Sequence, residues 1–147
     1  MVKSSTDTVN GPHLPLGFYA VQSINCYCKS GLLFSNCCQP FIEGLKVAST
    51  AEQLMRSRYS AFCLHNEPYL KLTWHPTTRP EAIDFDEQQR WLGLKIISSH
   101  DGGVGDSVGQ VEFVARYKIH DRAYRLHENS DFVMQNGSWQ YTQGTLL

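Results

Sequence analysis

Apolar side chains between residues 50 and 66 recur at helical spacing and predict an amphipathic helix. Ser49 or Thr50 begins it as the N-cap, because Glu52 and Gln53 stand three residues further on in two overlapping capping boxes. Arg58 lies in the middle of the apolar stripe, which consists of Ala51, Leu54, Met55, Phe62 and His65. A charged group on this face needs a partner once the helix packs.

Two shorter helices are expected after this one. The first starts at Glu67-Pro68, because proline is tolerated in a first helical turn, and ends before His75-Pro76. The second follows Asp84 and carries Trp91.

The last third of the chain has the alternation typical of strands. Candidate strands cover residues 92–99, 109–119, 123–135 and 138–145, separated by Asp101-Gly102-Gly103, His120-Asp121 and Asn136-Gly137. Helical signals come first and strand signals follow, which is the order of an α+β fold.

Tight turns set the register of the predicted sheet. Asn136-Gly137 is the strongest hairpin signal in the chain, and His120-Asp121 is taken as a second two-residue turn. The resulting opposite pairs share one face: Met134 with Trp139, Phe132 with Tyr141, Tyr117 with Tyr124, Ala115 with Leu126, and Phe113 with Glu128.

Glu128 is a charge on the apolar inner face of the sheet, as Arg58 is on the helix. Neither group tolerates burial alone, because an unpaired charge in an apolar setting is costly. The sequence therefore predicts a bidentate ion pair between Arg58 and Glu128 that links helix to sheet.

Composition narrows the class of protein. The chain has 147 residues, 41% hydrophobic and 18% charged, with a formal net charge of −1. These values exclude a disordered chain, and the lack of a basic run argues against nucleic-acid binding. No apolar stretch approaches the roughly 18 residues of a membrane span and no secretory signal is visible, so we expect a cytoplasmic protein.

Four of the five cysteines, Cys26, Cys28, Cys37 and Cys38, form the spacing C-x-C-x8-C-C. Adjacent Cα atoms lie about 3.8 Å apart, too close for an unstrained disulfide. Four thiolates suit a closed tetrahedral zinc site, and Ser30-Gly31 supplies the turn that joins the pairs. The alternative is four reduced cysteines that pack as small hydrophobes, which is the interpretation we give to Cys63.

Three segments follow from these patterns. Residues 1–23 are polar and punctuated by Gly and Pro, so we expect a flexible arm. Residues 24–40 form the cysteine knuckle, and residues 41–147 form the α+β domain.

The motif C-x-C-x-S-G-x5-C-C resembles the SEC-C zinc motif, best known from the C-terminal tail of the preprotein-translocase ATPase. Four further segments resemble the YchJ-like bacterial proteins: residues 54–61 (LMRSRYSA), 73–76 (TWHP), 126–130 (LHENS) and 139–141 (WQY). The resemblance covers about residues 24 to 146. It implies zinc at the four cysteines, then a cone-shaped domain of the nuclear-transport-factor-2-like fold, with three helices packed on a curved antiparallel sheet.

The chain departs from that motif at Lys29 and Gln39, where glycine is usual, and at Leu32 and Leu33, where basic residues are usual. In the translocase the knuckle docks on an export chaperone, a contact that basic character favours. Lys29 is the one charged residue between Val21 and Ile42. The sequence therefore argues against that chaperone as a partner.

The cone-shaped fold carries both enzymes and binding proteins, so fold alone does not decide the function. The first interpretation is a protein-docking or ligand-binding module, with Leu32, Leu33 and Phe34 either as a docking surface or packed against the cone. The alternative is a small-molecule hydrolase, isomerase or dehydratase on the inner face of the cone. Its candidates are Glu128 as acid or base, Arg58 as an anion clamp, and Tyr59, Trp74 and His75 as lining or proton-transfer groups.

Overall fold

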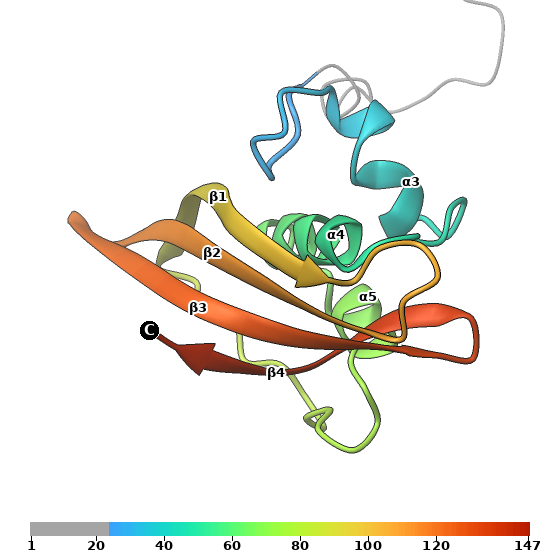
Figure 1. Cartoon of the computed structure of the whole chain (residues 1–147). Coiled ribbons are helices and arrows are strands. Elements are labelled where there is room, and N and C mark those ends of the chain that lie inside the picture. Colours follow the sequence, from blue (N-terminus) through green and yellow to red (C-terminus); the bar gives the residue numbers. More distant parts are fainter. Residues whose placement is uncertain (1–23) are drawn as a thin grey trace, which may run out of the picture.

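The structure is a computed structural model and describes residues 24–147. The flexible arm predicted for residues 1–23 lies outside the described residues. Within the described part, three α-helices precede a four-stranded antiparallel sheet, so the fold is α+β (Figure 1). The elements are η1 (Phe34–Asn36), α3 (Gln39–Ile42), α4 (Ala51–Cys63), α5 (Glu67–Leu72), β1 (Gln89–Asp101), β2 (Val108–Ile119), β3 (Arg122–Gln135) and β4 (Ser138–Leu146).

The capping residues begin α4 as the sequence predicts. Thr50 Oγ1 accepts a hydrogen bond from the Gln53 backbone N–H at 3.1 Å, and Gln53 Oε1 accepts from the Ser49 N–H at 2.8 Å. These two bonds satisfy donors that a helix start leaves free. The helix ends at Cys63, earlier than expected, because His65 turns into the left-handed region with φ of 54°.

The sheet has the order β1-β2-β3-β4, and all five predicted cross-strand pairs are present. Register shifts interrupt β1 between Trp91 and Gly93 and between Ile96 and Ser98. A third shift lies in β4, where Thr142 has no partner opposite Asp131 and Phe132 of β3. Bulges of this kind bend a strand and increase its twist. The sheet is therefore curved, with α4 lying across one face (Figure 1).

The prediction of a helix after Asp84 is wrong. Residues 83–86 have no regular secondary structure, residues 87 and 88 form a turn, and Trp91 lies in β1, where it pairs with Tyr117. Strand β1 begins at Gln89, three residues before its predicted start. The added residues pair with the C-terminal end of β2, which satisfies their backbone N–H and C=O groups. The third α-helix is instead α3, beside the cysteines.

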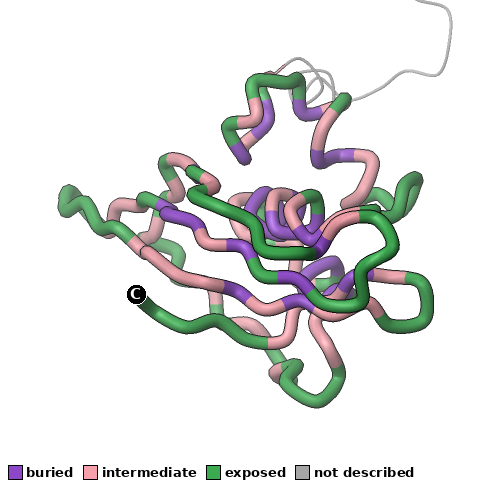
Figure 2. The backbone as a smooth tube through the Cα atoms, viewed as in Figure 1, coloured by how far each residue is buried: buried purple, intermediate pink, exposed green. Residues whose placement is uncertain are grey.

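The knuckle and the sheet share one core. Cys26, Cys28, Cys38 and Phe34 belong to the same buried cluster as Leu54, Val111 and Trp139. Figure 2 shows these buried positions along α4, the knuckle and the middle of the strands, while hairpin tips are exposed. The boundary predicted at residues 40 and 41 falls inside α3, and the division into two folding units stays a prediction. No helix in residues 24–147 is long and apolar enough to cross a membrane.

Candidate functional site

The four cysteines are brought together by a short hairpin and the turn that follows it. Cys26 N–H donates to the Leu32 carbonyl at 2.8 Å, and Phe34 N–H donates to the Ile24 carbonyl at 2.9 Å. Lys29 and Gly31 adopt positive φ of 62° and 92°. Lys29 thus occupies a left-handed position where glycine is unstrained, which explains why the SEC-C motif usually has glycine there.

The sulfur atoms fit a tetrahedral metal site. All four lie within 4.8 Å of one another, with 3.6 Å between Cys28 and Cys37 and 3.9 Å between Cys37 and Cys38. Zn–S bonds of about 2.3 Å set sulfur separations of about 3.8 Å in a tetrahedron. The cysteines are free thiols, so this cluster could hold a metal ion.

Polar groups from α4 and the hairpin surround these sulfurs. Arg56 donates through Nη1 to the Cys28 carbonyl at 3.0 Å and lies 3.6 Å from Cys28 Sγ. Ser30 Oγ lies 3.1 Å from Cys37 Sγ, and Ser60 Oγ lies 3.6 Å from Cys26 Sγ. Partners of this kind orient metal ligands and offset the negative charge of the thiolates.

The thiols also differ in how readily they ionise. Hydrogen bonds from the Cys26 and Cys38 thiols lower the pKa of Cys28. Burial raises the pKa of Cys37 to about 11, and the same hydrogen-bond network raises that of Cys38. A divalent metal ion would favour the ionised form of these thiols, because cysteine binds metal as the thiolate.

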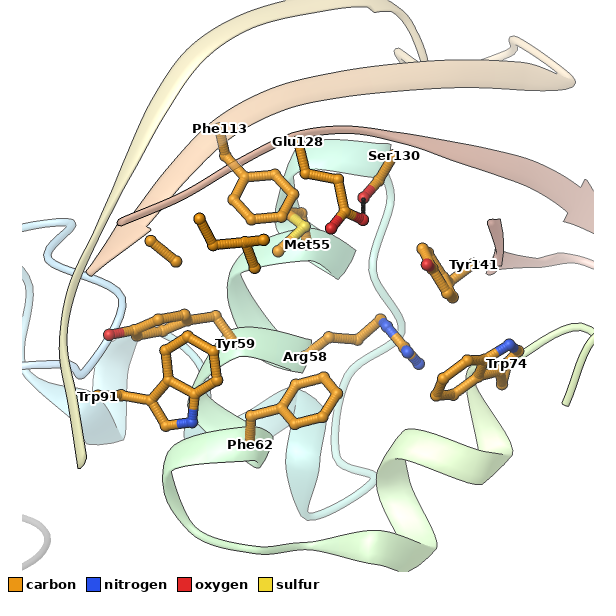
Figure 3. A pocket seen from close by; sticks show the side chains of 12 residues that line it. Met55, Arg58, Tyr59, Phe62, Trp74, Trp91, Phe113, Glu128, Ser130 and Tyr141 are labelled. Carbon is orange, nitrogen blue, oxygen red and sulfur yellow. Dashed lines mark hydrogen bonds between the residues drawn. The ribbon is translucent and has the colours of Figure 1, made fainter. Parts of the chain in front are cut away.

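A cavity of about 270 Å³ lies between α4 and the curved sheet (Figure 3). Its apolar side chains come from α4 and strands β1 to β3 and include Met55, Tyr59, Phe62, Trp91, Phe113 and Leu126. Its polar end is formed by Arg58, Trp74, Glu128, Ser130 and Tyr141. Pockets lined mostly by apolar and aromatic groups, with a few converging polar groups, are typical of small-molecule sites.

Arg58 enters the polar end of the cavity from α4 and is only 3% exposed. Its Nη1 donates to the Leu70 carbonyl at 2.8 Å and to Thr73 Oγ1 at 2.7 Å. The guanidinium carbon lies 4.9 Å from the Trp74 ring centre and 4.6 Å from that of Tyr141. Burial lowers the pKa of Arg58 to about 10, so the group is still a cation at neutral pH.

Glu128 approaches the same cavity from β3. Ser130 Oγ donates to its carboxylate at 3.2 Å, and burial raises the pKa of Glu128. The carboxylate lies against Gly144 of the neighbouring strand β4, so closely that a Cβ at this position would collide with it. The glycine thus leaves the space that the carboxylate occupies.

The predicted ion pair between Arg58 and Glu128 is wrong. In residues 24–147 the ion pairs are Arg56 with Glu52 and His127 with Glu112, and neither includes Arg58 or Glu128. The two predicted groups line one cavity but find other partners. Arg58 is held on the side of α5 and Tyr141, which helical phase alone could not indicate.

The other residues predicted for the cavity or the docking surface are only partly found there. Tyr59 and Trp74 line the cavity, whereas His75 lies outside it and contacts Thr77 and Gln135. Of the three apolar knuckle residues, Phe34 is buried in the shared core, which is the packing alternative, whereas Leu32 and Leu33 are exposed. Sequence reasoning missed Tyr141 as a cavity residue, although its predicted pairing with Phe132 already placed it on the inner face.

Comparison with known proteins agrees with this architecture. A family described as "YchJ, middle NTF2-like domain" matches residues 50–144. A UPF0225 protein from Chromobacterium violaceum is 44% identical over 122 residues, which covers 81% of this chain and 90% of the relative.

Two solved structures have the same fold. The solution structure of a SEC-C motif containing protein from Rhodopseudomonas palustris superposes with a TM-score of 0.74 at 33% identity, covering 84% of this chain and 99% of that one. The crystal structure of a SEC-C motif containing protein from Psychrobacter arcticus gives a TM-score of 0.72 at 30% identity, covering 87% and 85%.

Proposed function

The chain belongs to the YchJ-like family, and from that premise we propose that it is a zinc-stabilised protein whose cone binds a small molecule. The aromatic cavity between α4 and the sheet carries this proposal. A domain that served only as a scaffold would fill such a space with side chains, because protein interiors pack to the density of organic crystals. Here the space remains, and charged and polar groups converge on it.

Zinc is the metal we propose for the cysteine cluster. Four thiolate ligands favour zinc over magnesium or calcium, which prefer oxygen ligands. The sulfurs are arranged as a closed set, so the metal would have a structural role and leave no open position for a substrate. Thiolate ligands must stay reduced, which is why we place the protein in the cytoplasm.

The cavity proposal is tested with toluene, a neutral apolar probe. Trp74 and Trp91 line the cavity, whereas Trp139 lies elsewhere in the core with its Nε1–H bonded to the Ser49 carbonyl at 3.1 Å. In a ¹⁵N NMR titration the indole N–H signals of Trp74 and Trp91 should shift with toluene and saturate, while the signal of Trp139 stays in place. Equal shifts of all three signals, or no shift at all, would contradict a binding cavity.

A catalytic role is a second candidate, and Glu128 is the observation that favours it. Its carboxyl lies beside Ser130 in the cavity, and burial raises its pKa, which is the direction of shift found in glutamates that act as general acids or bases. A hydrolase, isomerase or dehydratase could use this group for proton transfer. Glu128→Gln would then abolish turnover and leave ligand binding intact.

Docking of a protein partner on the knuckle is a further proposal, resting on the exposed side chains of Leu32 and Leu33. Both stand next to the cysteine cluster, on a hairpin whose shape a bound metal would hold. A partner retained by the intact protein and lost from Leu32→Ser/Leu33→Ser would support this role.

A further inference from the structure

The positive charge of Arg58 in the cavity is not neutralised by an acidic side chain of the described residues. Among residues 24–147 no carboxylate lies within ion-pair distance of it, although the side chain is almost fully buried. Burial of a charge without an opposite charge is costly in a folded protein. Arg58, the residue with this uncompensated charge, lines the cavity.

The neighbours of Arg58 hold it in place and leave one edge free. Nη1 is used by the Leu70 carbonyl and by Thr73, and the rings of Trp74 and Tyr141 lie close to the guanidinium. In the described part of the chain, the hydrogen bonds of the Arg58 side chain are all made by Nη1, so Nε and Nη2 have no partner. These two nitrogens form one edge of the guanidinium plane, which is the geometry that takes a carboxylate by two parallel hydrogen bonds.

The rest of the cavity indicates what the carboxylate is attached to. The rings of Phe62, Trp91 and Phe113 offer flat apolar surfaces, and Figure 3 shows them around the space beside Arg58. The volume of about 270 Å³ is slightly below the usual range for drug-sized ligands. The molecule is therefore small, about the size of a single substituted ring.

On these grounds we propose that the cavity binds a small organic monocarboxylate with a flat apolar body, its carboxylate on the free edge of Arg58. This inference rests on the proposed binding function and names its ligand class. Glu128 and Ser130 lie across the cavity from Arg58 (Figure 3). A second anionic group on the ligand would face the Glu128 carboxylate there, whereas a hydroxyl or amine would donate to it.

Three shape-matched probes test the sign of the ligand charge on the unaltered protein. Benzoate, benzamide and benzamidine have the same planar ring and differ in carrying a negative, zero or positive charge. We expect benzoate to bind at least about tenfold more tightly than benzamide, the effect of a hydrogen bond to a charged group. Benzamidine should bind most weakly, because its cation would face Arg58.

The indole signals of Trp74 and Trp91 report binding, and that of Trp139 serves as the internal control. Benzamide binding as tightly as benzoate, or benzamidine binding most tightly, would overturn the charge assignment and leave the binding cavity standing. If neither toluene nor any of the three probes shifts the Trp74 and Trp91 signals, the proposed function fails together with the inference.

Two variants test whether Arg58 is the group that binds the carboxylate. Arg58→Met should remove the preference for benzoate over benzamide, whereas Arg58→Lys should keep part of it, because a cation remains without the bidentate edge. A preference that persists in Arg58→Met would overturn the role of Arg58. Should Arg58→Met not fold, Arg58→Lys decides the matter: it must lower the affinity for benzoate more than that for benzamide, and equal losses would contradict the proposal.

Discussion

Arg56 and Arg58 stand two residues apart on α4 and point into two different regions. Arg56 faces the cysteine cluster, where it contacts Cys28 and pairs with Glu52 at 3.1 Å. Arg58 faces the cavity, where its partners in the described structure are neutral. The arginine beside the cysteine cluster thus has a carboxylate partner, whereas the arginine in the cavity has none among the described residues.

The two sides of α4 therefore contribute differently, one to the stability of the fold and the other to the cavity. The cluster side of α4 closes around buried sulfurs and shares their core, so it resembles a structural site. The cavity side keeps an open space, a buried cation and a carboxyl with a raised pKa. Groups held at an energetic cost are common where a protein binds its ligand.

Loss of a cysteine ligand should have the largest effect. Cys37→Ser should abolish binding of one zinc ion per chain and lower the melting temperature strongly, because metal binding and folding are coupled at such sites. Elemental analysis and a thermal melt measure the two outcomes. Cys63→Ser is the control, since its sulfur is not part of the cluster. Zinc retained at one per chain in Cys37→Ser would contradict the assignment.

Arg56→Met should weaken zinc binding without removing the ligands. Outer partners of metal ligands typically contribute about 10-fold to 100-fold in affinity, and competition with a chelator measures this change. Glu52→Gln is the matched control, because it removes only the half-exposed partner of Arg56 and should cost at most about 1 kcal/mol of stability. An unchanged zinc affinity would show that Arg56 merely packs beside the cluster.

Gly144→Ala should destabilise the protein by about 1 kcal/mol, because the new methyl group displaces the Glu128 carboxylate and strains its contact with Ser130. Chemical denaturation measures the loss. In the background of Glu128→Ala the same substitution should cost little, since the colliding group is gone. Gly103→Ala is the control, because its Cβ would meet only Asp106 Oδ2 at an ordinary 3.6 Å. Equal losses in both backgrounds would argue against the close approach.

Arg58→Met should change the free energy of unfolding by only about 1 kcal/mol or less. Removing the buried charge relieves its desolvation, which offsets the loss of hydrogen bonds and ring contacts. An ion pair between Arg58 and a carboxylate would instead predict a loss of about 3 to 5 kcal/mol. A denaturation curve separates the two cases, and a loss of the larger size would point to an anionic partner.

Glu128→Gln should have the smallest effect on stability and a distinctive pH dependence. Burial raises the pKa of Glu128 in the folded state, so the ionised carboxylate weakens the fold above that pKa. The variant should be slightly more stable at pH 7, by about half a kcal/mol or less, because the group is only partly buried. This advantage should vanish below the ordinary pKa of glutamate, about 4.3. Tyr141 and Arg58, which also face the cavity, titrate far above this range.

The β2–β3 and β3–β4 hairpins could be predicted in detail because their information is local. Asn136-Gly137 and the alternation on either side place Met134 against Trp139 without reference to any distant residue. The spacing of Cys26, Cys28, Cys37 and Cys38 likewise places four sulfurs within reach of one ion, since a short turn joins them.

Only the tertiary structure decided where the remaining groups meet. Trp91 lies in a strand because β1 pairs with β2, a contact that its own sequence neighbours do not encode. Helical phase placed Arg58 on the buried face of α4, and strand alternation placed Glu128 on the inner face of the sheet. Periodicity determines the face of an element but not which residue of another element stands opposite. That choice depends on how α5, Trp74 and Tyr141 pack around Arg58, and it left a cavity in place of the expected ion pair.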